Sequence, residues 1–163
     1  MSRFYSVKFK LFFLISFVFS IFLGIDSYFD ICEKNKQLEK YLFNLNESTA
    51  KLIEKNTNSD LYNLNYTKIK NTLNSFDNEY IEDIYILNKK GFIFVQRDVN
   101  KLQLKQYEDF NELKNSSQNK SNVFFKDIKL ADKELGYLVI KNNIELYYKD
   151  KENLQKQVNL RFT

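Results

Sequence analysis

The sequence contains no histidine, proline or tryptophan, and its 163 residues include one cysteine and three glycines. A single cysteine excludes an intramolecular disulfide, and without histidine no Cys/His zinc site can be assembled. The most common general base in enzymes is missing for the same reason. No glycine-rich phosphate loop or nucleophile–base motif is recognisable either. We therefore predict a protein that is not an enzyme and that holds no metal and no cofactor.

The sequence also lacks an excess of either sign of charge beyond its N-terminal residues. The net charge is +4, but Arg3, Lys8 and Lys10 all precede the first acidic residue, Asp26. Removing these three from the 25 lysines and arginines leaves 22 basic residues against 21 acidic ones beyond residue 25. A protein that binds nucleic acid usually has a clustered basic surface. The balance therefore predicts no nucleic-acid partner.

One apolar run, LFFLISFVFSIFLGI, extends from Leu11 to Ile25. A membrane-spanning helix needs roughly 17–25 apolar residues, and the flanking residues can lengthen this run. The basic residues before it favour an N-terminus in the cytoplasm. We expect a cytoplasmic tail at 1–10, a transmembrane helix at 11–25, and a single-pass protein of the cytoplasmic (inner) membrane whose bulk is extracytoplasmic. A cleaved signal peptide has the same order of residues, but the small residues that cleavage requires are poorly placed here.

A helical pattern follows at 26–60, where Lys and Glu dominate the sequence. Apolar residues recur there every seven positions, namely Ile31, Leu38, Leu45 and Leu52. This spacing favours pairing of one helix with another. We predict a juxtamembrane helix that makes the protein a homodimer, with packing of this stripe on the chain's own sheet as the alternative. The cap-forming residues of NTNSD, Asn56 to Asp60, are expected to end the helix.

Beyond residue 60 the pattern indicates an α+β fold. Two β-prone runs flank the loop NKKG, in which Gly91 can adopt the positive φ that other residues resist. Both faces of this hairpin are apolar, which predicts that both are covered. Gly136 indicates a bulge or a close approach of backbone. The expected elements are a helix at 61–76, strands at 81–87 and 92–97, a helix at 102–113, strands at 123–130 and 135–141, and an exit helix at 144–163.

Three stretches resemble a known family: LYNLNYTKIKNTLNSF, IEDIYILNKKGFIFVQRD and FFKDIKLADKELGYLVIKNN. They are similar to the extracytoplasmic PAS-like sensor domains, of single-Cache or CHASE type, of diguanylate cyclases, histidine kinases and chemoreceptors. Asn88 and Gly91 match the family's hairpin position, and the run from Leu135 to Ile140 matches its late strand. The resemblance covers 61–143 and implies a PAS-like antiparallel sheet that senses a small ligand or a periplasmic protein.

The chain departs from such receptors because no second apolar span and no output-domain motif follow the exit helix. It is then either a receptor truncated before its second span and output domain, or a stand-alone sensor that acts on another membrane protein. We expect a membrane-anchored sensor domain that relays binding through helices to the lipid bilayer. The alternative is a single-span scaffold protein of a division or secretion complex.

Six residues are candidates for ligand binding. Arg97 can clamp a carboxylate or phosphate with its guanidinium group, and we expect it to share a face with Ile93 and Val95; a strand-end arginine paired with Asp98 is the simpler interpretation. The others are the aromatic residues Tyr85, Phe94, Tyr107, Phe125 and Tyr137. Aromatic residues at strand spacing more often form core. The four carboxylates between Asp77 and Asp83 suit a solvated loop better than a cation site.

Overall fold

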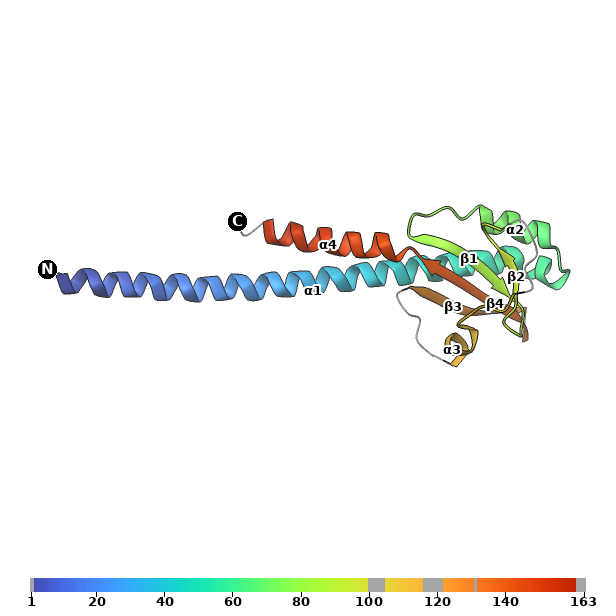
Figure 1. Cartoon of the computed structure of the whole chain (residues 1–163), viewed down its shortest axis with the longest axis horizontal. Helices are drawn as coiled ribbons and strands as arrows, with labels where there is room; N and C mark the ends of the chain where they lie inside the picture. Colours follow the sequence, from blue (N-terminus) through green and yellow to red (C-terminus); the bar gives the residue numbers. More distant parts are fainter. Residues whose placement is uncertain (1, 100–104, 116–121, 131, 161–163) are drawn as a thin grey trace. The chain divides into compact units, whose positions relative to one another are not determined.

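The computed structural model describes residues 2–99, 105–115, 122–130 and 132–160. The chain divides into two compact units, one formed by Met1–Leu38 with Lys149–Thr163 and the other by Glu39–Tyr148. Figure 1 shows the elements in sequence colours. They are α1 (Ser2–Tyr62), α2 (Tyr66–Asn74), β1 (Ile81–Leu87), β2 (Ile93–Gln96), α3 (Phe110–Asn115), β3 (Val123–Leu130), β4 (Lys133–Asn142) and α4 (Ile144–Leu160). The predicted α+β class is confirmed.

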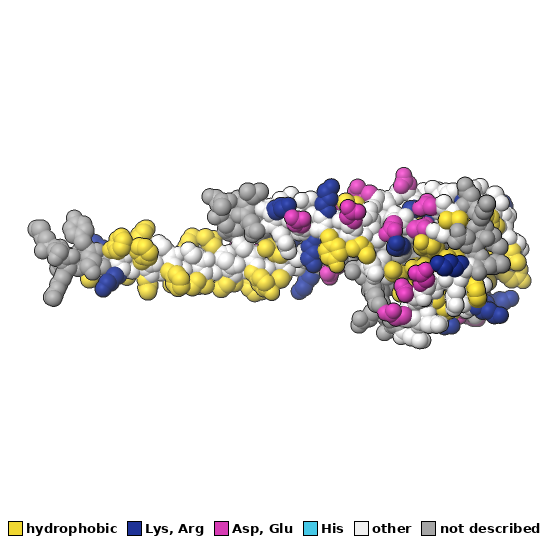
Figure 2. Space-filling model, in the orientation of Figure 1, with side chains coloured by type: hydrophobic (Ala, Val, Ile, Leu, Met, Phe, Trp, Pro, Cys, Tyr) yellow, Lys and Arg dark blue, Asp and Glu magenta, His cyan; other side chains and the backbone are white. Residues whose placement is uncertain are grey.

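Helix α1 is one unbroken helix of 61 residues. Its N-terminal part is long and apolar enough to cross a membrane, and no residue of the most apolar window is buried in the chain. Figure 2 shows apolar side chains along this stretch without Asp or Glu among them. The expected transmembrane helix is therefore present as a helix with an exposed apolar surface.

The expected break at Asn56–Asp60 is wrong, because α1 continues to Tyr62. Tertiary contacts outweigh the capping tendency of these residues. Thr57 is fully buried, and its hydroxyl donates to the Ile53 carbonyl at 2.7 Å. The side-chain amide of Asn58 donates to the carbonyl of Lys129 in β3 at 3.2 Å.

Helix α1 ends in a Schellman-type turn around Leu64. The amide of Asn65 donates to the Asp60 carbonyl at 2.8 Å, and the amide of Leu64 donates to the Leu61 carbonyl at 3.2 Å. This turn needs a left-handed residue, which is usually glycine, and Leu64 takes that role at φ 53°. Helix α2 then begins at Tyr66 rather than at the predicted residue 61, with the Asn65 side chain as its N-cap.

The four strands form one antiparallel sheet in the order β2-β1-β4-β3. The two predicted hairpins are confirmed, and β1 and β4 pair between them. In the NKKG loop Gly91 has φ 81°, as predicted. The Asn88 side chain accepts from the amides of Lys90 at 2.8 Å and Phe92 at 3.1 Å, so it fixes the turn.

The predicted helix at 102–113 is shorter in the structure, because α3 begins only at Phe110 and Gln106 forms a β-bridge with Phe92. Residues 102–104 of the predicted helix lie outside the described residues.

Three irregularities in strand pairing decide which side chains face which side. They lie at Ile81/Asp83, at Ile86/Leu87 and at Ile128/Lys129. A bulge adds one residue to a strand and reverses the alternation of its side chains. Gly136 lies at the third one, and a Cβ there would come within 2.1 Å of the Leu87 carbonyl oxygen. The predicted close approach of backbone at Gly136 is therefore confirmed.

Each face of the sheet is covered by its own cluster of apolar side chains, as predicted. Helices α1 and α2 cover one face, which we call the helix face; its fully buried residues include Ala50, Ile53, Ile69, Ile84 and Ile140. The other face, which we call the open face, is covered by 105–113; its cluster contains Leu87, Ile93, Phe110, Tyr137 and Val139. Figure 1 shows α2 and α3 on opposite sides of the sheet.

The buried residues of α1 in this unit do not follow the predicted seven-residue stripe. Leu42 and Ile53 are buried with exposures of 4% and 0%, and Ile53 belongs to the cluster on the helix face, whereas Leu52 is 51% exposed. The alternative that the stripe packs on the chain's own sheet is therefore contradicted at Leu52. Ile31 and Leu38 are half-buried, and both lie in the unit that also contains 149–163.

Candidate ligand-binding site

The open face carries a depression beside the β1–β2 hairpin. It has a volume of about 310 Å³ and is lined by Tyr85, Ile93, Gln96, Lys105, Gln106, Tyr107, Glu108, Asp109 and Lys141. The lining comes from β1, β2, β4 and the segment 105–109. A volume near 300 Å³ is at the small end of the range for ligand sites.

The bulge at Ile81/Asp83 decides which side chains of β1 lie at this depression and behind it. Ile81 belongs to the cluster on the helix face, and simple alternation would have placed Asp83 there as well. The added residue turns Asp83 and Tyr85 to the open face instead. Asp83 is 7% exposed and accepts from the Gln96 amide at 2.6 Å and from the amide of Ile84 at 2.7 Å.

The segment that covers the depression is held by backbone hydrogen bonds to the hairpin. The amide of Ile93 donates to the Lys105 carbonyl at 2.9 Å, and the amide of Tyr107 donates to the Gly91 carbonyl at 2.9 Å. The Tyr85 and Tyr107 rings meet edge to face with centroids 5.3 Å apart. The left-handed Gly91 thus positions both the turn and the aromatic cover.

Burial and nearby carboxylates keep both tyrosines protonated. Burial is the larger cause of the raised pKa of Tyr85, and the Asp83 carboxylate, to which the phenol is hydrogen-bonded, raises it further. Burial also raises the pKa of Tyr107, with Asp109 as the next cause. Both phenols are therefore neutral hydrogen-bonding groups at any physiological pH.

The two lysines of the depression already have anionic partners. Lys105 Nζ lies 2.8 Å from Glu108 Oε1, and Lys141 Nζ lies 2.5 Å from Glu82 Oε1. Asp83 and Asp109 have no cationic partner among the residues that the structure describes. The charge close to the depression is consequently more negative than positive.

The predicted residues Phe125 and Tyr137 share the open face but lie beside the depression. Their rings stack with centroids 5.1 Å apart at 21°, and Phe110 contacts Tyr137 at 5.3 Å. Tyr137 is only 5% exposed. These side chains therefore form the core under α3, as the simpler interpretation had it.

Phe94 lies on the helix face, where its ring meets that of Tyr66 at 6.4 Å. The irregularity at Ile86/Leu87 makes Phe94 the extra residue of β2, since Val95 pairs with Ile86 and Ile93 pairs with Leu87. Ile93 and Val95 consequently belong to clusters on opposite faces. The expectation that Arg97 shares a face with both is wrong for this reason.

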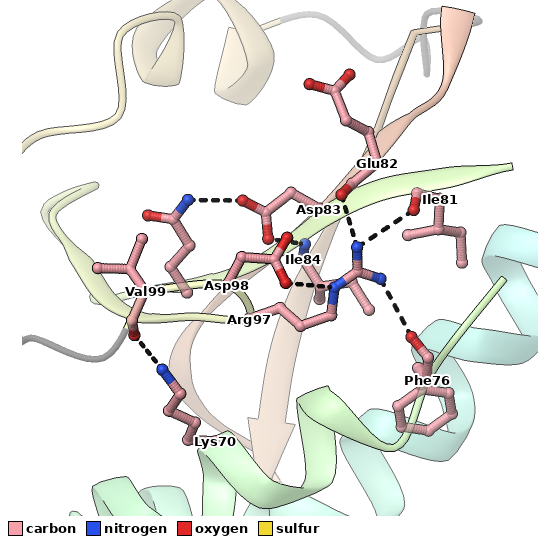
Figure 3. Close-up of polar contacts among 10 residues, drawn as sticks. Lys70, Phe76, Ile81, Glu82, Asp83, Ile84, Arg97, Asp98 and Val99 are labelled. Atoms are coloured by element: carbon pink, nitrogen blue, oxygen red, sulfur yellow. Dashed lines mark hydrogen bonds and ion pairs between the residues drawn. The ribbon is translucent and has the colours of Figure 1, made fainter. Parts of the chain in front are cut away.

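The Arg97 guanidinium group is held by the chain itself (Figure 3). It donates to the carbonyls of Phe76 at 3.1 Å, Ile81 at 3.3 Å and Glu82 at 2.6 Å, and Nε lies 3.4 Å from Asp98 Oδ1. The side chain is 13% exposed. A ligand carboxylate would have to displace some of these bonds. A more open hollow of about 380 Å³ adjoins it, lined by Asn74, Phe76, Asp77, Arg97 and Asp98.

The structure thus separates the six predicted residues. Tyr85 and Tyr107 line the depression, Phe125 and Tyr137 lie next to it, and Phe94 and Arg97 lie elsewhere. The sequence pattern did not identify Gln96 and Lys141, which line the depression, or Asp83 behind it. Only the polar Asp83 and Gln96 within otherwise apolar strands were a signal, because a buried charge in a strand requires a partner.

The carboxylates between Asp77 and Asp83 do not converge. Glu82 pairs with Lys141, and Asp83 turns to Gln96. Across the described ranges no three His, Cys, Asp or Glu side chains come together as metal ligands. A comparison of the sequence with family models and with curated proteins finds no match.

Proposed function

We propose that this protein is a membrane-anchored sensor with a PAS-like extracytoplasmic domain. In this proposal the basic N-terminal residues keep the tail in the cytoplasm, and Glu39–Tyr148 binds a small ligand or a periplasmic protein outside it. The function is binding, without a catalytic step. The protein either acts on another membrane protein or is part of a larger receptor.

One observation carries this proposal: the same helix, α1, contains the apolar segment and supports the sheet. Its apolar side chains from Leu11 to Ile25 are exposed, whereas Ala50 and Ile53 are fully buried beneath the sheet. The candidate depression lies on the opposite face of that sheet. The part of α1 around Ala50 and Ile53 and the depression therefore lie on opposite faces of the same sheet.

A tightly packed sheet responds to binding by changing between discrete arrangements. Occupancy of the depression would favour one existing arrangement of the β1–β2 hairpin over others. Glu54 of α1 pairs with Lys126 of β3 at 2.9 Å, and Tyr147 of α4 donates to Glu39 of α1 at 3.3 Å. These contacts support transfer of a change in the sheet to α1.

A homodimer through the juxtamembrane helix is part of the proposal. Leu52 and Tyr41 are 51% and 50% exposed on α1, and exposed apolar positions at helical spacing suit a second helix. Dimerisation would let two copies change their relative arrangement across the bilayer.

The test uses the full chain in lipid nanodiscs with an environment-sensitive fluorophore on α1. The exposed Lys36→Cys, in a Cys32→Ser background, carries the label between the apolar run and the sheet. A small-molecule library is screened for compounds that both raise the melting temperature and change the emission. Gln106→Trp, which fills the depression from an exposed position, should abolish both responses, and Asn111→Trp on α3 is the matched control.

Compounds that stabilise the chain without changing the emission would overturn the relay to the membrane. A screen in which neither compounds nor extracytoplasmic protein fractions change the emission would favour the scaffold alternative.

A further inference from the structure

Around the depression on the open face, the lysines form ion pairs, whereas two carboxylates have no counter-ion among the described residues. Both lysines are neutralised, Lys105 by Glu108 and Lys141 by Glu82. The carboxylates of Asp83 and Asp109 have no counter-ion among the described residues. An anionic ligand would therefore meet the carboxylate of Asp109 in the lining, with that of Asp83 buried behind Tyr85 and Gln96, and would have to break an existing ion pair to reach a lysine.

The aromatic lining also favours a positively charged ligand. Tyr85 and Tyr107 meet edge to face, so the faces of the two rings point in different directions. A cation over the face of a tyrosine within about 6 Å of its centre is attracted by the ring quadrupole. Each phenol oxygen can also accept a hydrogen bond from an N–H group.

Size limits the ligand further. The depression of about 310 Å³ accommodates a small molecule rather than a peptide. Gln96 and Gln106 add amide groups to its lining, and these can bind a polar end of a ligand without adding charge.

We propose that this depression binds a small organic cation, a primary or quaternary ammonium compound, with Asp109 and Asp83 supplying the negative charge and Tyr85 and Tyr107 the aromatic wall. Asp109 lies at the exposed rim and contacts the ligand, while Asp83 acts from behind through Tyr85 and Gln96. The inference rests on the proposed function, because it names the ligand of the same depression.

The probe is choline, and binding is measured by calorimetry on the full chain in detergent micelles. Two analogues are the controls: the neutral isostere in which a tert-butyl group replaces the trimethylammonium group, and butyrate. We expect choline to bind, with affinity falling as salt is added, and neither analogue to bind measurably.

Four variants assign the contacts. Asp109→Asn keeps the shape and should weaken choline binding several-fold, and Tyr107→Leu should weaken it about 5-fold or more, while Tyr107→Phe keeps the ring and most of the affinity. Glu47→Gln removes an exposed carboxylate from α1 and should change nothing. All three positions are exposed or half-buried, and melting curves confirm that each of the four variants is folded.

Equal binding of choline and its neutral isostere, preferential binding of butyrate, or no binding of choline would each overturn the cation assignment. The proposed sensor function fails separately. If choline binds but leaves the α1 fluorophore unchanged, the ligand class stands and the relay is wrong. If another compound changes the fluorophore and choline does not bind, the relay stands and the ligand class is wrong.

Discussion

At the scale of single residues, Leu64 occupies a position that suits glycine. Its φ of 53° costs a residue with a Cβ about 1–2 kcal/mol, and its side chain is 71% exposed, so little burial offsets that cost. We predict that Leu64→Gly stabilises the chain by about 0.5–1 kcal/mol, since glycine loses part of the gain to its greater freedom when unfolded. Thermal unfolding of the full chain measures this.

The neighbouring Asn63→Gly is the control for Leu64→Gly. Asn63 does not have a positive φ, so glycine there should destabilise the chain or leave it unchanged. A loss of stability in Leu64→Gly would mean that the Leu64 side chain is needed by the fold.

Tyr85 gives the depression a pH dependence at the alkaline end. Burial, and then the Asp83 carboxylate, raise its pKa above the usual value of about 10. Because the unfolded chain releases this proton first, the stabilisation is complete below pH about 10 and is lost as the pH rises above it. Ultraviolet titration should show a late-ionising tyrosine that Tyr85→Phe removes, and the alkaline loss of stability should become shallower.

Tyr62→Phe, at a tyrosine that is 60% exposed, is the matched control for that titration. It should leave the late-ionising group intact. A late signal of unchanged size in Tyr85→Phe would contradict the burial of this phenol against Asp83.

Single residues differ in how well the sequence predicts them. Gly91 was predictable because a tight loop between two strands has few ways to close, and a positive φ excludes most residues. The bonds of Arg97 were not, because its acceptors are carbonyls of residues 76, 81 and 82, and a backbone carbonyl leaves no trace in the sequence. Only the three-dimensional structure shows that Arg97 binds to carbonyls of its own chain.

At the scale of elements, the orientation of α1 under the sheet buries one of two adjacent residues and exposes the other. Ile53 is fully buried and Leu52 is 51% exposed. Ile53→Ala should cost about 2–5 kcal/mol of unfolding free energy through the cavity that it leaves. Leu52→Ala should cost well under 1 kcal/mol in the same denaturation series, and in a homodimer through α1 it should reduce chemical cross-linking between copies.

Equal losses for the two alanine variants would place the seven-residue stripe against the sheet and contradict the observed orientation of α1. A Leu52→Ala variant with unchanged cross-linking would argue against a dimer seam at this position.

Strands were predicted better than helices. Strands β1 and β3 match their expected bounds because β-branched and aromatic residues cluster there and turn residues flank them. The end of α1 was mispredicted because Thr57 is buried in the fold and Asn58 donates a tertiary hydrogen bond to Lys129, and local propensity includes neither. The faces of β2 were mispredicted because one bulge reverses the alternation, and neither Phe94 nor its neighbours signal it.

At the scale of the whole molecule, the orientation across the membrane is open to direct labelling. In a Cys32→Ser background, Lys51→Cys should react with a membrane-impermeant maleimide in intact cells, because residue 51 is exposed and lies beyond the apolar run. Ser6→Cys, before that run, should react only after the membrane is permeabilised. Gel-shift of the labelled protein measures both.

Labelling of both positions in intact cells would mean that the basic tail is not in the cytoplasm. A mature chain that begins beyond residue 25 by mass spectrometry would replace the anchor with a cleaved signal peptide.

Helix α1 runs from Ser2 to Tyr62 without a proline, and its one glycine, Gly24, leaves it unbroken. Each residue inserted into it turns everything beyond by about 100°, and seven bring it back to within about 20° of its starting direction. A ladder of alanine insertions near residue 36 would therefore make any output oscillate with helical phase, and the amplitude of that oscillation would measure how stiff the coupling is.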